Sequence, residues 1–282
     1  MAKRTTKHTT QVILVVSQKG GSAKTTNILN LATASMFQGT RNVVILDCDP
    51  QRTATLWQDD NREERVKNFD YVLPQVVAPA NDMMPSELIK RLKDAEMDEI
   101  WIDTAGFVGY KKDTAQMYLN DILPHVNIIV TPLKASKFDL NATKDTMEYI
   151  NFIGKNINLN VPKLLLPSDI KGGEKGVAYV HNLLEPVVTM PENADWSVMN
   201  TYIPYSGLFV KAHERGGNAF VPRKIEKVTE AYIEALLEIH EKLGLSSGSK
   251  KRESIQDIIA SLHTTRLNAS KEKRQDELEE EQ

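Results

Sequence analysis

A ten-residue stretch near the amino terminus, residues 17–26, has the residue types that bind phosphate. It is Ser-Gln-Lys-Gly-Gly-Ser-Ala-Lys-Thr-Thr, and it lies between a continuously apolar run and a segment with helical spacing. A loop between a buried strand and a helix directs backbone N–H groups and the helix N-terminus at an anion, and glycines let the backbone approach it. In such a loop Lys24 would bridge the β- and γ-phosphates of a nucleotide, and the Thr25 hydroxyl would bind Mg²⁺.

This loop departs from the strict pattern G-x-x-x-x-G-K-[ST]. Gln18 and Ala23 occupy the two glycine positions, and the segment matches the form Lys-Gly-Gly-x-x-Lys-Thr-Thr, which has a second lysine, Lys19, at its start. A tight turn that merely exposes two lysines is the alternative. The position between a strand and a helix favours phosphate binding.

Two carboxylates follow the next apolar run, residues 43–46. They are Asp47 and Asp49, in the string Asp-Cys-Asp-Pro-Gln. In an open parallel sheet ligands bind beyond the carboxyl ends of the strands, so these side chains can face the phosphates bound by the first loop. The alternative, weighed more heavily for Asp47, is an aspartate that ends a strand and caps the following helix.

A third apolar run, residues 100–102, ends in Asp103. A hydrophobic strand that ends in aspartate is the Walker B pattern, in which the carboxylate binds Mg²⁺ through water. The pattern is weak alone, but here it follows the other two motifs in order.

Five short apolar runs alternate with longer amphipathic segments and would position these residues. The runs are continuously apolar, as in strands covered on both faces. They are residues 12–16, 43–46, 100–102, 127–131 and 163–166, and the helical segments are 25–38, 85–93, 142–153 and 224–243. This alternation predicts an α/β fold with a doubly wound, mostly parallel sheet and helices on both faces.

Composition divides the chain into three parts. Residues 1–10 are a basic tail expected to be flexible, residues 11–245 form the α/β domain, and residues 246–282 are a charged linker and tail. The tail carries one short amphipathic stripe, residues 255–262, with apolar positions at helical spacing. Such a stripe on a charged tail is expected to pack against another surface.

Overall composition excludes several classes of protein. The 282 residues are 41% hydrophobic and carry a net charge of −3, which excludes a wholly basic nucleic-acid coat. The single cysteine, Cys48, excludes a disulfide framework and a zinc or iron–sulfur site built from this chain's cysteines alone. No run approaches the ~18 apolar residues of a membrane span. We therefore expect a cytoplasmic protein.

Together these motifs resemble those of the ParA/MinD family, the P-loop ATPases with a deviant Walker A motif. The resemblance rests on the lysine-bearing loop, the Asp-x-Asp-Pro-Gln string, the Walker B run and the later Ile-Pro segment at residues 203–204, and it spans about residues 12–240. The chain is most similar to ParA-type partition ATPases that lack an N-terminal helix-turn-helix domain. It departs from the family at Ala23, where glycine is usual, and at Ala105, where proline is usual.

The resemblance implies ATP and Mg²⁺ as cofactors and assigns roles to particular residues. Lys19 would be the signature lysine that reaches the partner's phosphates in a nucleotide-sandwich homodimer. Asp49 would hold the attacking water, Asp47 would support it, and Pro204 would lie in a segment that closes over the adenine. The implied catalytic residues are Lys19, Lys24 and Asp49; the implied metal site is Thr25, Asp47, Asp49 and Asp103; the implied nucleotide contacts are Lys19, Gly20, Gly21, Ser22, Ala23, Lys24, Thr25, Thr26 and Pro204.

A local basic cluster follows in the carboxyl-terminal third of the domain. It consists of Lys211, Arg215, Arg223, Lys224 and Lys227. Clusters of this density are usually a solvated face. In ParA-type relatives, however, basic residues of this region contact DNA without regard to sequence, so the resemblance implies binding to double-stranded DNA.

The function expected from the resemblance is that of a ParA-type ATPase with weak intrinsic turnover. It would dimerise on ATP, bind DNA non-specifically on the nucleoid, and segregate a plasmid or other DNA cargo with a ParB-like partner that stimulates hydrolysis. The alternatives are a MinD-like ATPase that cycles on membranes, or a positioner of a protein cargo. The stripe at 255–262 lacks Phe and Trp and contains Asp257, which argues against a membrane anchor. Cys48 alone cannot build the cluster of a nitrogenase-reductase relative.

Overall fold

The computed structural model describes most of the predicted α/β domain. The described residues are 9–38, 42–60, 73–80, 82–106, 114–209, 217–220 and 226–245, together with residues 258, 260, 261 and 264 of the tail. Four members of the basic cluster, Lys211, Arg215, Arg223 and Lys224, lie outside the described residues, as do residues 1–8 and most of the stripe at 255–262. Of that stripe, Ile258 is buried and belongs to one of the two hydrophobic clusters of the core.

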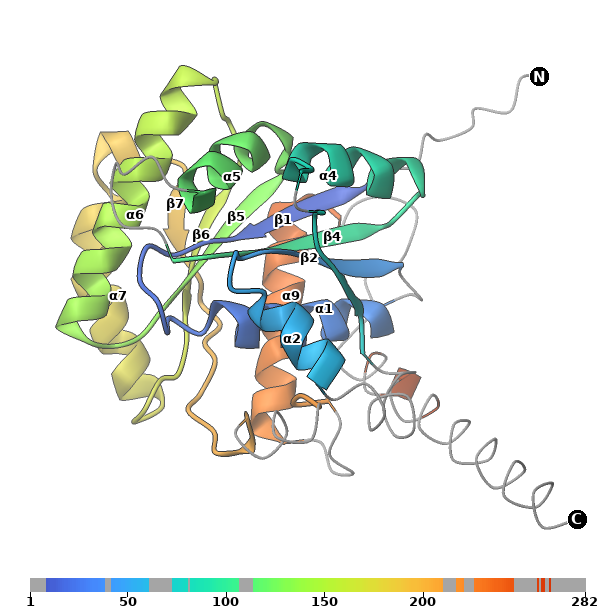
Figure 1. The fold of residues 1–282 in the computed structure, drawn as a ribbon. Helices are drawn as coiled ribbons and strands as arrows, with labels where there is room; N and C mark the ends of the chain where they lie inside the picture. Colours follow the sequence, from blue (N-terminus) through green and yellow to red (C-terminus); the bar gives the residue numbers. More distant parts are fainter. Residues whose placement is uncertain are drawn as a thin grey trace, which may run out of the picture.

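Seven strands of the described chain form one parallel sheet in the order β3-β2-β4-β1-β5-β6-β7 (Figure 1). After β1 the chain adds strands on one side, and from β5 onward it adds them on the other, so the winding direction reverses beside β1. The predicted parallel α/β fold is confirmed. The strands are β1 (Gln11–Val15), β2 (Val43–Cys48), β3 (Gln75–Val77), β4 (Glu99–Thr104), β5 (Ile128–Leu133), β6 (Lys163–Pro167) and β7 (Trp196–Val198).

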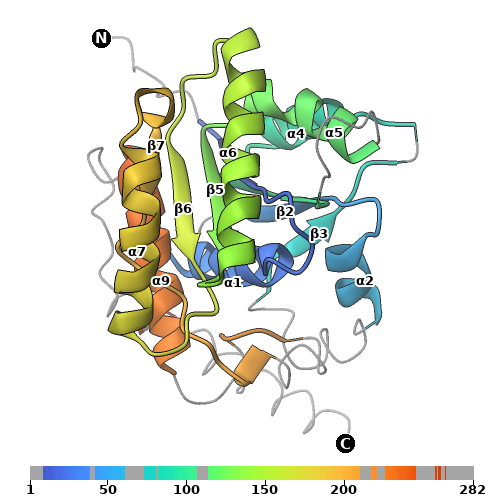
Figure 2. The ribbon, with the colours of Figure 1, turned by 90° about the vertical axis from the view of Figure 1, so that its left-hand side faces the viewer.

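Helices cover both faces of this sheet. Alternate strand residues point to opposite faces, so Ile13 and Val15 enter one hydrophobic cluster while Val12 and Leu14 enter the other. Figure 1 shows α1, α2 and α9 on one side and α4 and α5 on the other, and Figure 2 shows α6 lying along β5. The helices are α1 (Lys24–Phe37), α2 (Thr53–Asp60), α4 (Pro85–Asp94), α5 (Thr114–Ile122), α6 (Lys137–Asn156), α7 (Glu174–Val188) and α9 (Lys227–Lys242).

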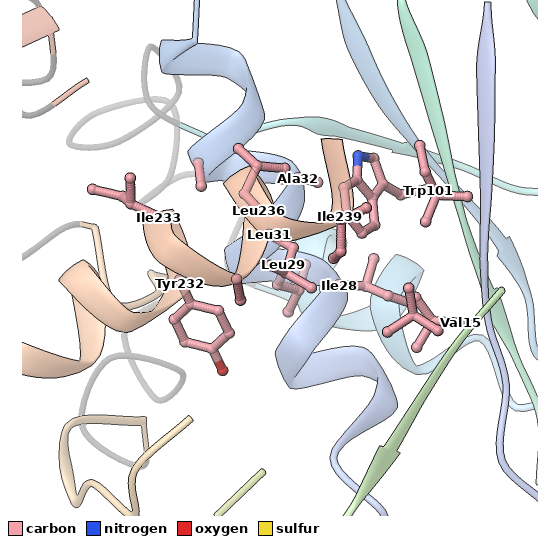
Figure 3. Close-up of a cluster of buried hydrophobic side chains, with 14 of the residues drawn as sticks. Val15, Ile28, Leu29, Leu31, Ala32, Trp101, Tyr232, Ile233, Leu236 and Ile239 are labelled. Carbon is pink, nitrogen blue, oxygen red and sulfur yellow. The ribbon is translucent and has the colours of Figure 1, made fainter. Parts of the chain in front are cut away.

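The helix that follows the lysine-bearing loop, α1, is almost completely buried between the sheet and α9. Figure 3 shows Ile28 next to Val15 of β1, and Tyr232 and Leu236 of α9 lying against α1. These labelled side chains are at most 1% exposed. Because packing on both sides holds α1 in place, the start of this helix has a fixed position at the edge of the sheet.

Buried polar side chains also fix the rotation of α1 about its axis. Asn27 donates to Ser168 Oγ over 3.1 Å and accepts a hydrogen bond from the Tyr232 hydroxyl over 3.1 Å. One turn later, Asn30 Oδ1 accepts from the backbone N–H of Ala219 over 2.8 Å. A buried amide tolerates only a geometry that satisfies it, so these bonds specify one orientation of the helix.

Within the described residues no helix is both long and apolar enough to cross a membrane.

Candidate functional site

The loops that follow β1, β2 and β4 meet at one edge of the sheet. β4 pairs with both neighbours, so Val15 lies beside Asp103 and Asp103 lies beside Asp47 in the strand register. This edge is next to the point where the winding direction reverses, which is where α/β sheets bind ligands. A cavity of about 490 Å³ opens there. It is lined by Gln18, Gly20, Gly21, Ser22, Ala23, Lys24, Thr25, Thr26, Asp49, Pro50, Gln51, Thr53, Ala105 and Gly106.

The predicted phosphate loop curls around this cavity through two residues in the left-handed region. Gly21 has φ 72° and Ala23 has φ 67°. Glycine adopts this conformation freely, whereas for another residue it costs roughly 1–2 kcal/mol. The departure from glycine at Ala23 therefore keeps the loop's shape at a small energetic cost. The loop is anchored at its start by a 3.0 Å hydrogen bond from the Gln18 N–H to Thr146 Oγ1 of α6.

Lys24, at the first position of α1, has its ammonium group inside the loop. It is 7% exposed and donates to the carbonyl oxygens of Lys19 over 3.2 Å and of Ser17 over 3.4 Å. Burial lowers the pKa of Lys24, while the nearby carboxylates of Asp103 and Asp49 oppose that shift. A buried cation that lines a cavity next to a helix N-terminus is well suited to bind an anion.

Thr25 and Asp103 form the second polar pair of the site. The Thr25 hydroxyl donates to Asp103 Oδ2 over 2.7 Å, and Asp103 is completely buried. Burial raises the pKa of Asp103 to about 7. Among the described residues nothing hydrogen bonds to Asp103 Oδ1. A hydroxyl and a carboxylate with a free oxygen are hard donors of the kind that magnesium prefers, directly or through water, so the pair fits a Mg²⁺ ion.

The two aspartates at the carboxyl end of β2 have different surroundings. Asp47 is buried and accepts hydrogen bonds from the Asp49 N–H over 3.1 Å, and from the N–H and hydroxyl of Thr55 over 2.8 Å each. Its carboxylate therefore caps the first turn of α2. Asp49 is half-buried and lines the cavity. Both aspartates were predicted to belong to the metal site; Asp49 lines the cavity, and Asp47 holds the segment that carries Asp49.

Lys19 lies on the outer side of the loop and does not line the cavity. Its side chain is 44% exposed, and its ammonium forms a 2.7 Å ion pair with Asp139 of α6. Burial by itself would raise the pKa of Asp139, but hydrogen bonds from Lys19 and from Ser136 outweigh it and keep that pKa below its ordinary value. The pairing joins residues 120 positions apart, and sequence reasoning did not predict it.

Gly106, which the sequence patterns did not single out, supports the phosphate loop from behind. A Cβ at this position would lie 3.0 Å from the Gly20 nitrogen and 3.1 Å from the Gln18 oxygen. The loop after β4 thus packs directly on the backbone of the phosphate loop. The sequence signal was a glycine just after the carboxylate, where close approach of two backbones needs a residue without a side chain.

Two further residues predicted to be functional, Pro204 and Lys227, do not line this cavity. Pro204 forms a bridge with Ile170 and lines a separate cavity of about 460 Å³ between the Tyr202–Ser206 segment and α9. Lys227, the described member of the basic cluster, is exposed at the start of α9 and lines the same second cavity. The predicted contact of Pro204 with adenine thus stays a prediction.

Comparisons with known proteins find sequences similar to parts of this chain. The family model described as an AAA domain matches residues 10–122. Among curated relatives, Protein ParA of Rhizobium radiobacter is 23% identical over 141 residues, 49% of this chain and 55% of that protein. Protein virC1 of the same organism is 25% identical over 185 residues, 64% of this chain and 75% of that protein. The matched segment thus spans about half the length of the first of these relatives.

Solved structures share the fold at low sequence identity. A plasmid partition protein of Borrelia burgdorferi bound to AMPPNP has a TM-score of 0.56 and 18% identity, covering 83% of this chain and 99% of that one. The MinC:MinD complex of Aquifex aeolicus has a TM-score of 0.60 and 16% identity, covering 86% of this chain and 100% of that one. An ATP complex of McdA from Cyanothece has a TM-score of 0.56 and 13% identity, with the same coverage.

The raised pKa of Asp103 predicts a pH dependence of stability. Between about pH 4 and the folded-state pKa near 7, the folded chain holds a proton on Asp103 that the unfolded chain has released. The contribution of Asp103 to the free energy of unfolding should therefore fall as the pH rises through this window, by up to roughly 1.4 kcal/mol per pH unit.

Asp103→Asn cannot titrate, so without Mg²⁺ the wild type should lose stability relative to this variant from pH 4 to 7. Urea unfolding followed by circular dichroism measures the difference, with exposed Asp94→Asn as control. Parallel pH profiles for the wild type and Asp103→Asn would contradict the assignment.

Proposed function

We propose that this chain, a member of the ParA/MinD family of P-loop ATPases by its motifs, fold and relatives, is a ParA-type ATPase that positions DNA. One observation carries the proposal: the loops after β1, β2 and β4 meet around one cavity lined by Lys24, Asp49 and Thr25, and Thr25 is hydrogen bonded to the buried Asp103. The ligands proposed for this cavity are ATP and Mg²⁺. Two solved neighbours support this choice: the Borrelia burgdorferi protein is bound to AMPPNP, and cobyrinic acid a,c-diamide synthase of Mycobacterium smegmatis holds an ATP analogue and magnesium.

The chain's own residues supply what phosphoryl transfer needs, which is mostly position and charge. Lys24 brings a buried positive charge to the β- and γ-phosphates, and the loop's N–H groups surround them. Thr25 and Asp103 would hold Mg²⁺, which neutralises charge that develops on the phosphate oxygens. Asp49 would orient the attacking water from the turn at the cavity's edge. This turn is well defined, since the Gln51 N–H donates to Asp49 Oδ1 over 2.8 Å.

The proposed dimer depends on Lys19. The Lys19 side chain is half-exposed and pairs with Asp139 instead of lining the cavity of its own chain. Lys19 is therefore available to a second copy of the chain. In an ATP-bound homodimer it would leave Asp139 and contact the phosphates in the partner subunit. ATP would favour the closed pair because it supplies the charge that Lys19 binds there.

Cargo and partner follow from the relatives rather than from the site. The Rhizobium radiobacter ParA and the Borrelia plasmid partition protein support a role in DNA partition. In this proposal the ATP dimer binds double-stranded DNA without sequence preference and collects on the nucleoid. A ParB-like partner bound to the cargo stimulates hydrolysis and releases the dimer. The DNA contacts would come from Lys211, Arg215, Arg223, Lys224 and Lys227.

A second candidate is a positioning ATPase of the MinD kind, which acts on a membrane, or one that moves a protein cargo. MinD and McdA structures resemble this chain about as closely as the partition protein does. Pelleting with anionic liposomes, run beside a gel shift with plain DNA, separates these functions. In the proposed function the ATP-loaded protein shifts DNA and stays in the supernatant with liposomes.

The two loop lysines should give different defects when each is replaced by alanine. Lys24→Ala should reduce ATP affinity roughly 10- to 100-fold, because it removes a charge-assisted contact to the phosphates inside the same chain. Lys19→Ala should keep near wild-type affinity and lose ATP-dependent dimerisation. Titration with a fluorescent ATP analogue and sedimentation velocity measure the two properties, with exposed Lys90→Ala as control. A normal ATP dimer of Lys19→Ala would exclude the role in the partner's site, and normal affinity of Lys24→Ala would exclude the phosphate site.

Charge reversal in the basic cluster should weaken DNA binding equally on all sequences. Each phosphate contact contributes a slope of about −0.9 to log K against log salt, so Arg223→Glu with Lys224→Glu should flatten the salt dependence of the dimer clearly. Gel shifts of the ATP-loaded protein over a salt series measure the slope. The matched control is Lys90→Glu with Arg91→Glu, an adjacent exposed basic pair on α4. If the slope is unchanged for the Arg223 and Lys224 variant, the DNA-binding face is elsewhere.

A further inference from the structure

Arg52 joins the turn that carries Asp49 to helix α2, and its backbone has an uncommon conformation. Its φ is 55°, in the left-handed region. This region is strained for a residue with a side chain, whereas glycine would adopt it freely. Glycine would therefore suit this backbone conformation better than arginine. The contacts of the arginine side chain have to offset the energetic cost of the left-handed conformation.

The guanidinium group of Arg52 binds two carbonyl oxygens at the end of neighbouring strands. Nη1 donates to the oxygen of Asp47 over 3.1 Å, and Nη2 donates to the oxygen of Pro79 over 2.5 Å. Pairing between β2 and β3 ends at Leu46 and Val77, and the nearby Pro79 has no N–H to extend it. The planar fork of arginine thus ties together two strand ends that main-chain bonds no longer connect.

The backbone of Arg52 completes the turn that carries Asp49. Its N–H donates to the Asp49 oxygen over 2.8 Å, and its own oxygen accepts from the Leu56 N–H over 2.8 Å, which starts α2. On the other side, Asp47 Oδ1 accepts from the Asp49 N–H. Asp49 therefore lies in a turn whose far end is attached through Arg52 to the edge of the sheet.

We propose that Arg52 is a positioning residue for Asp49. Its two side-chain bonds hold the turn against β2 and β3, so that the Asp49 carboxylate stays where it can orient water. The inference rests on the proposed ATPase function for its kinetic consequence. Because hydrolysis needs accurate placement and binding of the phosphates uses other residues, loss of the guanidinium should slow turnover and leave ATP binding nearly intact.

Arg52→Gly is the informative variant because it separates the two properties of the residue. It relaxes the left-handed backbone and removes the guanidinium, so a purely conformational role predicts a variant at least as good as the wild type. Arg52→Lys keeps a positive charge but has a single nitrogen in place of the fork. Arg91→Gln on α4, an exposed arginine far along the chain, controls for loss of charge.

Two measurements read out the effect. The first is amide hydrogen exchange on the ligand-free protein, in peptides that cover residues 47–56. In Arg52→Gly the amides of Asp49, Gln51 and Leu56 should exchange at least about tenfold faster, since one charge-assisted bond is worth about this factor. The second is steady-state ATP hydrolysis. There kcat should fall about ten- to a hundredfold, with KM within about twofold, and Arg52→Lys should be intermediate.

Two results would overturn the inference. Arg52→Gly with wild-type exchange and wild-type kcat would mean that the turn holds Asp49 without the guanidinium. Parallel losses of kcat, ATP affinity and melting temperature would mean a general role in stability instead of a positioning role. If the wild-type chain hydrolyses no ATP, the proposed function fails, and the exchange comparison then decides by itself whether Arg52 holds the turn.

Discussion

Two opposite charges are buried at one edge of the sheet, and this constraint governs the elements around them. The Lys24 ammonium and the Asp103 carboxylate are both removed from water, and each shifts the pKa of the other towards the charged form. Desolvation of charges is expensive unless hydrogen bonds and a counter-charge offset it. Two carbonyl oxygens and the Thr25 hydroxyl supply part of this compensation, and a phosphate with its metal ion would supply the rest.

This constraint explains why the elements around the edge are held so firmly. The strand order places β1, β4 and β2 side by side, which brings their loops together. Buried amides fix the rotation of α1, and Gly106 allows the loop after β4 to pack against the phosphate loop. Asp47 and Arg52 then fasten the turn that carries Asp49. Each of these contacts limits movement of a group that must meet the same ligand.

Patterns local in the sequence predicted the central strands, the helix after the loop and the cavity's main residues. Contacts between distant segments were not predictable in this way. The ion pair of Lys19 with Asp139 depends on how α6 lies beside the loop. The local alternative for Asp47, an aspartate that caps the following helix, agrees with the hydrogen bonds that it accepts from Thr55 of α2. α6 begins at residue 137, earlier than predicted, because the Ser136 side chain caps it. Some elements were not predicted because their sequences show too little hydrophobic periodicity. Among them are the short edge strands β3 and β7 and the helix α7, which contains Pro186.

Single-turnover hydrolysis by Asp49→Ala is the decisive measurement for the proposed hydrolysis of ATP at this edge of the sheet. Radiolabelled ATP with Mg²⁺ is mixed with excess protein, and released phosphate is followed over hours, beside a filter-binding measurement of affinity. We expect affinity close to wild type and a hydrolysis rate lower by about a hundredfold or more, because the residue proposed to orient the water is missing. Hydrolysis at the wild-type rate would contradict this proposal.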